Sequence, residues 1–205
     1  MKGATAASAC GVAAATAGVA KGTSSFRMTE PLVHAHVSLS RLQALWMIPI
    51  ALAVHNAEEA ITFPACLPLV RAALPASIQP FMAEVEPDGL RVALLWATAV
   101  PFMVLLWVTL RPASLGARWC ALLVQAVVAV NIASHLVVAA VVMRGYSPGL
   151  VSAVLINAPV SVYLFHRAAR ERWLPRTAWR ALWPAALLVH GPGLVGLLLL
   201  TRVGP

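Results

Sequence analysis

The sequence predicts an all-α membrane protein, a polytopic helix bundle with about five transmembrane helices. Of its 205 residues, 60% are hydrophobic and only 11% are charged, and the mean hydropathy is +0.83. Soluble domains carry roughly a quarter charged residues, which is about twice this share. The apolar residues also come in blocks long enough to cross a bilayer as a helix, which takes about 20 residues.

The net charge of +8 does not indicate binding to nucleic acid. The basic residues lie between the apolar blocks, where membrane proteins carry loop arginines and lysines for insertion. We therefore expect no nucleic-acid partner. The expected partners are membrane lipids and a hydrophobic small-molecule substrate.

Two regions differ in composition. Residues 1–40 are rich in Ala, Gly and Thr, and we expect them to form a low-complexity, disordered N-terminal tail. Residues 41–205 form the predicted integral membrane domain. Length and hydrophobicity predict five helices in this domain, at 42–63, 90–110, 118–143, 148–166 and 180–201.

Between the first two helices the chain is interrupted by prolines at 64, 68, 75, 80 and 87. Proline breaks helices, so this segment is expected to form short interfacial pieces or a re-entrant cap. At the start of the fourth helix, Ser147 is the predicted N-cap, and Pro148 fits the first turn, where its missing N–H costs nothing.

The distribution of basic residues predicts the orientation. With the N-terminus on the cytoplasmic side, only four of the fifteen Lys and Arg residues fall outside, namely Arg71, Arg91, Arg144 and Arg202. Cytoplasmic loops are normally the richer in Lys and Arg. The sequence therefore predicts a cytoplasmic N-terminus and an external C-terminus in a multi-pass protein of the plasma membrane.

The stretch HNAEEA, residues 55–60, continues the first apolar helix with polar residues. An ionised side chain in mid-membrane costs at least about 2.5–3.5 kcal/mol. Residues three and four apart share a helix face, so His55, Glu58 and Glu59 point the same way, and this face is expected to turn inward. On the third helix, Asn131 and His135 are also four residues apart.

The fourth and fifth predicted helices add Asn157 and His190. Counted at 1.5 Å per residue from the inner helix ends, the polar groups of the first, third and fifth helices reach similar depths. They converge on one layer in the middle to outer half of the membrane. The layer contains candidate ligands from at least three helices.

Two chemical accounts fit this layer. In the first, a divalent metal (iron, zinc or manganese), or a pair of such ions, is bound by His55, Glu58, Glu59, His135 and His190, with Asn131 or Asn157 beside the ligands. In the second, no metal binds, and a neutral Glu58 or Glu59 exchanges protons with a histidine. A purely structural role, in which a Glu–His cluster joins helices, is the alternative to both.

The chain resembles the HXXEE family of small bacterial integral membrane proteins, whose motif stands here as His55-Asn56-Ala57-Glu58-Glu59. The family pattern continues with NxxxH and YxPG motifs, and these match residues 131–135 and 146–149. The resemblance implies a bacterial membrane protein in which these positions, Tyr146 included, belong together. It leaves the chemistry open.

The sequence therefore predicts a metal-dependent membrane enzyme with a buried His/Glu site, in which Glu58 and Glu59 are the catalytic acids. Its substrate would be lipid-like or dissolved in the membrane, and the reaction hydrolysis or oxidation. One alternative is a metal-free isomerase or cyclase of isoprenoid or lipid substrates. Another is a transporter coupled to protons or metal ions, because such proteins also carry intramembrane acids.

Overall fold

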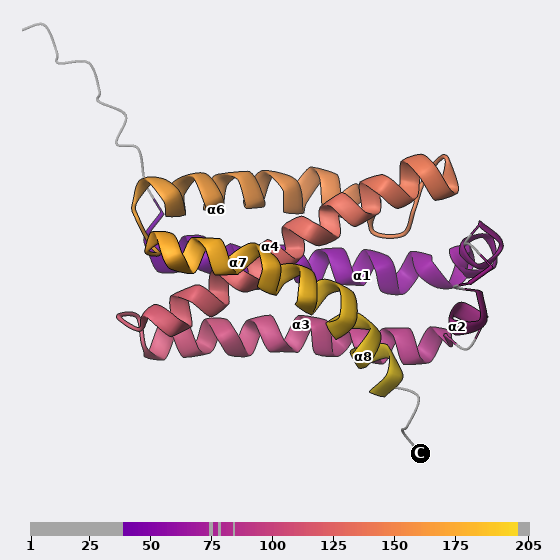
Figure 1. Cartoon of the computed structure of the whole chain (residues 1–205), viewed down its shortest axis with the longest axis horizontal. Coiled ribbons are helices and arrows are strands. Elements are labelled where there is room, and N and C mark those ends of the chain that lie inside the picture. The colour runs from indigo at the N-terminus through magenta and orange to yellow at the C-terminus, as the bar shows by residue number, and fades with distance from the viewer. Residues whose placement is uncertain (1–38, 74–75, 78, 84, 201–205) are drawn as a thin grey trace, which may run out of the picture. The chain divides into compact units, whose positions relative to one another are not determined.

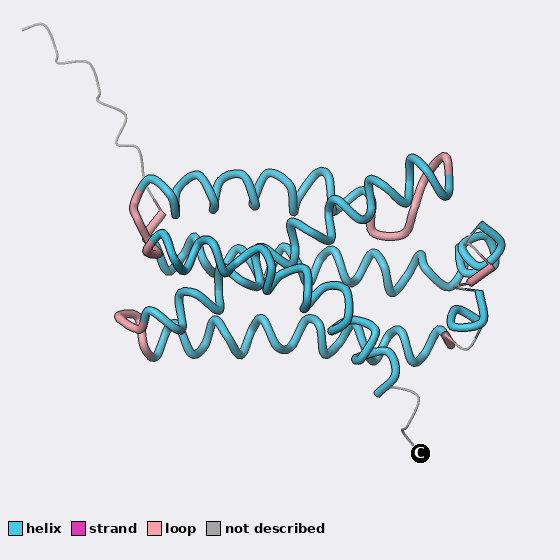
Figure 2. Tube along the Cα trace, in the orientation of Figure 1, coloured by secondary structure: helices cyan, strands magenta, loops and turns pink. Residues whose placement is uncertain are grey.

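The computed structural model describes residues 39–73, 76–77, 79–83 and 85–200, and every regular element in this part of the chain is a helix. The elements are α1 (Arg41–Ala73), α2 (Gln79–Ala83), α3 (Pro87–Leu110), α4 (Leu115–Val137), η1 (Val138–Met143), α5 (Leu150–Ser152), η2 (Ala153–Asn157), α6 (Ala158–Arg170), α7 (Arg176–Leu188), η3 (Val189–Gly193) and α8 (Leu194–Leu200). In Figures 1 and 2 the long helices lie side by side, and loops join them at the two ends of the bundle. Of the predicted disordered tail, residues 1–40, all but the last two lie outside the described residues.

Four continuous helical runs are long and apolar enough to cross a membrane: Pro87–Leu110, Leu115–Met143, Leu150–Arg170 and Arg176–Leu200. They correspond to the second to fifth predicted helices. The first predicted helix, 42–63, lies within α1, whose apolar run is interrupted by the polar residues at 55–59. The fold is therefore a helical membrane bundle with four or five helices apolar enough to span.

α1 is longer than the sequence predicts. The prolines at 64 and 68 were expected to end it, but the helix continues through both to Ala73. Two apolar residues of this extension are buried, Leu67 and Val70. The Arg71 guanidinium also donates to three backbone carbonyls of the 82–85 segment. These tertiary contacts outweigh the free-energy cost of the prolines within the helix. Among the described residues between α1 and α3, α2 is a short helix of the kind that the sequence predicts for this proline-rich segment.

The start of the fourth predicted helix also differs from the prediction. Helix α5 begins at Leu150, and its N-cap position is occupied by Gly149 at φ +78°. The Ser147 hydroxyl does not cap the helix, because it donates to the backbone carbonyl of His135 instead. Pro148 lies before the helix. Figure 2 shows the loop after η1 folding back toward the bundle before α5 begins.

The larger apolar core lies in the half of the bundle where α1 begins. It brings together buried side chains of α1, α3, α4, α6 and α7, among them Leu45, Ile48, Leu105, Leu122, Leu164 and Leu182. Several members are alanines, such as Ala44, Ala121 and Ala168, and small residues let membrane helices approach closely. A smaller cluster of Leu52, Val128, Ile132 and Ala153 follows along α1, between this core and His55.

The turn between α6 and α7 is held by Trp173, which is 2% exposed. The guanidinium carbons of Arg41 and Arg167 lie 5.3 and 5.8 Å from its ring centroid. Its indole Nε1 donates to Glu171 Oε2 at 2.7 Å, and Arg167 Nε donates to Glu171 Oε1 at 2.6 Å. These hydrogen bonds lower the pKa of Glu171 below its usual range, and the bond from Arg167 has the larger effect. Both carboxylate oxygens of Glu171 therefore already have hydrogen-bond donors at this turn.

Three π-helical segments occur among the described residues, and they end or interrupt long helical runs. η1 begins three residues after His135, η2 follows directly on Ser152, and η3 contains His190. Such segments are rare and are frequent at functional sites. Their placement beside polar residues marks one region of the bundle as irregular.

Candidate functional site

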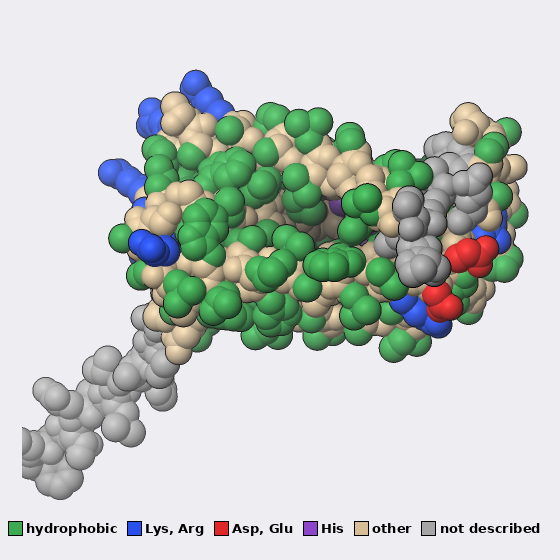
Figure 3. Space-filling model, turned by 90° about the horizontal axis from the view of Figure 1, so that it is seen from below, with side chains coloured by type: hydrophobic (Ala, Val, Ile, Leu, Met, Phe, Trp, Pro, Cys, Tyr) green, Lys and Arg blue, Asp and Glu red, His purple; other side chains and the backbone are tan. Residues whose placement is uncertain are grey.

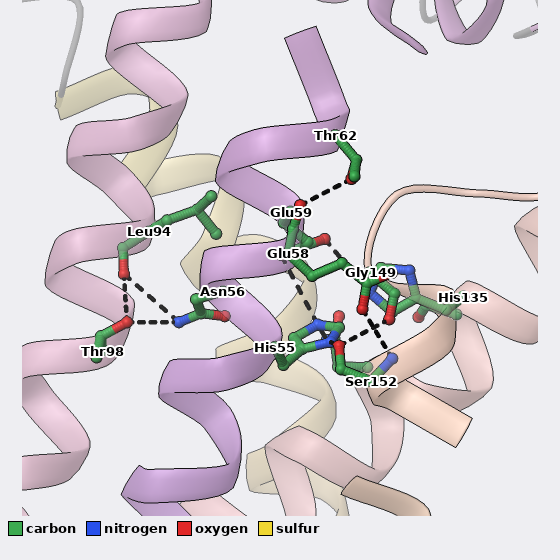
Figure 4. A network of polar contacts seen from close by, with 12 residues as sticks. His55, Asn56, Glu58, Glu59, Thr62, Leu94, Thr98, His135, Gly149 and Ser152 are labelled. Atoms are coloured by element: carbon green, nitrogen blue, oxygen red, sulfur yellow. Dashed lines mark hydrogen bonds and ion pairs between the residues drawn. The ribbon is translucent and has the colours of Figure 1, made fainter. Parts of the chain in front are cut away.

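α1 presents its polar residues to two different neighbours. His55 is fully buried and points toward the start of α5, whereas Asn56 points toward α3. There the Asn56 amide donates to the Thr98 hydroxyl at 2.7 Å, and Thr98 donates to a carbonyl one turn earlier (Figure 4). Asn56 thus fixes the rotation of α1 against α3. His55 and Glu59 point toward α4 and α5, where they meet His135 and Ser152.

Three side chains meet there: His55 and Glu59 from α1, and His135 from the end of α4. One ligand-type atom of each lies within 4.8 Å of the other two. His135 Nε2 is 3.3 Å from Glu59 Oε1, and His55 Nε2 is 3.7 Å from Glu59 Oε2. The two imidazole rings pack edge to face, with centroids 4.8 Å apart. We call these three residues the ligand group.

His55 is oriented by hydrogen bonds at both ring nitrogens. The Asn131 amide donates to Nε2 at 2.8 Å, so in the neutral ring Nδ1 carries the proton and donates to Ser152 Oγ at 3.0 Å. Ser152 Oγ in turn donates to the carbonyl of Gly149. This chain of donors holds the ring in one orientation, in which Nε2 accepts from Asn131 and lies 3.7 Å from Glu59 Oε2. Asn131, which the sequence analysis expected beside the ligand residues, is hydrogen-bonded to His55.

Gly149 closes the ligand group from the side of the loop. A Cβ at this position would lie 2.7 Å from both His55 Cε1 and Glu59 Cγ, and 3.0 Å from His135 Cε1. Its φ of +78° also lies in the left-handed region that favours glycine. The backbone therefore approaches all three members of the group at a distance that no other residue type permits.

Glu58 lies next to the ligand group but is occupied by other partners. Its Oε1 accepts from the Tyr146 hydroxyl at 2.8 Å and from the N–H of Val151 at 3.2 Å. Its Oε2 accepts from the N–H of Ser152 at 2.7 Å. The two backbone donors belong to the first turn of α5, so Glu58 caps a helix that its own helix packs against. It takes the place of the predicted Ser147 cap.

His190 does not join the ligand group. Its Nε2 lies 3.1 Å from Ser134 Oγ, and Ser134 donates its own proton to the carbonyl of Val130. His190 Nε2 is therefore the donor of this contact. The bond joins η3 to α4, one residue before His135 on the chain.

The ligand group is compact enough that it could hold a metal ion. Zinc–nitrogen bonds of about 2.0–2.1 Å in tetrahedral geometry place ligand atoms about 3.3 Å apart. The two distances from Glu59 to the histidines are close to this value. In addition, His135 Nε2 is buried and has no hydrogen-bond partner among the described residues, which is unusual for a buried nitrogen.

The comparison with known protein families bears on these same residues. Residues 46–164, more than half of the chain, match the model of the family described as "Protein of unknown function with HXXEE motif". The chain belongs to the HXXEE family. No curated protein and no solved structure matches the chain.

The HXXEE match includes the ligand group, Asn131, Tyr146, Gly149 and Ser152, and it ends before His190. The structure brings the three motifs together. His55 and Glu59 of HxxEE contact His135 of NxxxH. The tyrosine of YxPG binds the first glutamate, and its glycine closes the group. The sequence motifs therefore describe one site in space.

Asn157, which was expected beside the ligands, contacts a different polar group. Its side chain is 1% exposed, and its amide has no hydrogen-bond partner in the described part of the chain. Its backbone carbonyl accepts from Ser161 Oγ, which accepts from Gln125 Nε2 at 2.6 Å. No hydrogen bond joins the Asn157 side chain to the ligand group within those residues.

Sequence reasoning missed Ser152, Gly149 as a packing residue, and the contact of Asn56 with Thr98. Gly149 carried a signal, because a glycine directly before a helix often has positive φ. Ser152 carried none, since its role depends on a backbone that folds back after η1. Asn56 was visible as the second polar residue of HNAEE but points toward α3.

Proposed function

We propose that the ligand group binds a divalent metal ion and that the chain is a metal-dependent membrane enzyme. Its substrate would be lipid-like or dissolved in the membrane, and the reaction would be hydrolysis or oxidation. One observation carries the proposal: two imidazole nitrogens and a carboxylate from two helices converge within 4.8 Å at the centre of an apolar bundle. A cation there compensates a carboxylate that otherwise costs free energy in the membrane.

The number of ligands supports catalysis over a structural role. Two histidines and one carboxylate leave coordination positions open, as in catalytic zinc sites and in non-haem iron oxygenases. When bound, such an ion supplies Lewis acidity or redox chemistry at its open positions. Iron, zinc and manganese all accept this donor set, so the donor set is compatible with both reaction classes.

The surroundings are suited to a hydrophobic substrate. The side surface of the bundle is covered by apolar side chains, and in one view a hollow opens among them with a histidine visible at its bottom (Figure 3). A molecule dissolved in the bilayer can approach such an opening without crossing water. The chain's own residues then fix the site, since Asn131 and Ser152 orient His55, and Glu58 holds the start of α5.

A metal-free enzyme is the second candidate, and one distance favours it. His135 Nε2 lies 3.3 Å from Glu59 Oε1, close enough for exchange of a proton between them when a substrate binds. Glu58 suits this role less well, because three hydrogen bonds occupy its carboxylate. In this account Glu59 and His135 form the acid–base pair of an isomerase or cyclase.

Metal content distinguishes the two candidates. Wild-type protein purified in detergent is expected to contain about one transition-metal ion per chain by elemental analysis, and His55→Ala or His135→Ala almost none. Asn131→Ala is expected to bind metal more weakly by roughly 10- to 100-fold, as for residues that orient ligands. His190→Ala should retain the metal, because His190 bonds to Ser134.

The matched control is His166→Ala, an exposed histidine on α6 that makes no contact with the ligand group in the described residues. Its metal content should equal that of the wild type. Wild-type protein that contains no metal, and whose thermal stability is unaffected by a chelator, would refute the metal proposal and favour the acid–base pair.

We also propose that the N-terminus is cytoplasmic and the C-terminus external in a bacterial plasma membrane, from the distribution of Lys and Arg. Reporter fusions at Gly89, Ser114, Gly145 and Arg176 are then expected outside, inside, outside and inside. The four sites lie at or near the ends of the long helices. A cytoplasmic signal at both Gly145 and Arg176 would mean that the helix between them does not span, and a fully inverted pattern would reverse the orientation.

A further inference from the structure

A pocket lies away from the ligand group, at the turn between α6 and α7. It has a volume of about 1050 Å³ and is lined by Phe165, Ala169, Arg172, Leu174, Pro175, Arg176, Trp179, Arg180 and Trp183. On α6 the lining residues Phe165 and Ala169 are four residues apart. On α7 the lining residues Trp179, Arg180 and Trp183 follow Arg176 by three, four and seven residues. Each wall is therefore one face of its helix.

The charge of the pocket has one sign. Its lining contains three arginines and no acidic residue. Within the described residues none of these three guanidinium groups forms an ion pair, and the nearby Glu171 is engaged by Arg167, Arg41 and Trp173. Three exposed arginines without an acid form a site for an anion, and the planar guanidinium group suits phosphate best.

The aromatic residues give the pocket an apolar side. Phe165 lies between Trp179 and Trp183, with ring centroids 6.1 and 5.4 Å away. Arg172 and Arg176 lie at the turn, whereas Phe165 and Trp183 lie further along the helices. The pocket is therefore cationic at the bundle end and aromatic toward the bundle middle.

The depth of the pocket corresponds to the surface of a bilayer. The membrane-spanning run of α6 ends at Arg170, and that of α7 begins at Arg176. Tryptophans are enriched at this depth, and basic pockets between transmembrane helices bind the headgroups of anionic lipids. Figure 3 shows Arg side chains at both ends of the molecule, and several of them lie at the end where α6 is joined to α7.

We propose that this pocket binds one anionic glycerophospholipid of the adjacent leaflet. The three arginines bind its phosphodiester, and Phe165, Trp179 and Trp183 contact the upper parts of its acyl chains. A pocket of this volume holds a headgroup together with the first part of two chains. The site is independent of the metal and of the reaction proposed above.

The test is lipid binding to the full chain in a neutral detergent, followed by native mass spectrometry and by the thermal unfolding midpoint. Phosphatidylglycerol is expected to bind and to stabilise the wild type, and phosphatidylcholine to bind much more weakly. Each arginine removed should weaken phosphatidylglycerol binding about fivefold. The double variant Arg176→Gln/Arg180→Gln should therefore lose most of the preference.

The matched control is Arg111→Gln/Arg170→Gln, which removes the same charge from exposed positions at the same end of the bundle but outside the pocket lining. It should keep the preference for phosphatidylglycerol. Equal losses in the two double variants would mean a diffuse attraction to basic surface and would overturn the pocket. Stabilisation by glycerol phosphate as strong as by the lipid, at equal concentration, would overturn the lipid assignment. If the double variant in the pocket unfolds before lipid is added, the single variant Arg180→Gln is compared with the single variant Arg170→Gln instead.

Discussion

Replacing Gly149 with alanine is expected to destabilise the protein by about 2–5 kcal/mol. Two costs combine. An alanine at φ +78° costs about 1–2 kcal/mol in backbone strain, and its Cβ has to displace atoms only 2.7 Å away. The His55 ring cannot move cheaply, because it is fully buried and hydrogen-bonded at both nitrogens. Forced shifts in a packed interior cost about 1–3 kcal/mol more.

The measurement is the free energy of unfolding in a detergent titration, together with metal content. Gly145→Ala is the control in the same loop, since its added Cβ would lie 3.8 Å from its nearest contact, a carbonyl oxygen. It should change stability little. A Gly149→Ala variant that is as stable as Gly145→Ala would show that the loop does not pack against the ligand group as described.

Glu58 and Glu59, although adjacent, are expected to give opposite results when each is changed to glutamine. Glu58→Gln should lower the stability of the metal-free protein by about 1.5–3 kcal/mol, because an amide cannot accept all three hydrogen bonds that the carboxylate accepts. Its metal content should largely persist. Glu59→Gln should abolish metal binding, because Glu59 is the one carboxylate of the ligand group.

The comparison is made on chelator-treated samples, so that loss of a bound ion does not count as loss of stability. In that state Glu59→Gln should unfold like the wild type, since the ion-pair contacts of Glu59 within the described residues are with the two histidines, to which an amide oxygen can also lie close. Loss of metal in Glu58→Gln at unchanged stability would exchange the roles assigned to the two acids.

Much of the fold could be predicted from the sequence, because apolar length alone defines membrane helices. The second to fifth helices lie within a few residues of the predicted ranges. The errors arose where tertiary contacts override local rules. α1 continues through Pro64 and Pro68 because Arg71 and its neighbours bind the following segment. Ser147 fails as a cap because the chain folds back and Glu58 supplies the acceptor.

The candidate site could be predicted in part. The spacing of His55 and Glu59 on one helix, and of Asn131 and His135 on another, is a property of helix geometry, and the structure brings these four side chains together. The allocation of the other polar residues depends on details of rotation and depth. Helix spacing cannot separate Glu58 from Glu59. The depth estimated from the rise per residue placed His190 in the same layer as the other polar residues, but its hydrogen-bond partner is Ser134.

The polar contacts before and after the π-helical segment η2 both depend on the number of residues in it. Ser152 and Asn157 are both buried although they are five residues apart, a spacing that a continuous α-helix would place on different faces. Loss of one residue from η2 would rotate all of α6 by roughly 100° about its axis. Ser152 would stay beside His55, but Ser161 would turn away from Gln125. A one-residue deletion between Ser152 and Asn157 is therefore expected to disrupt these polar contacts.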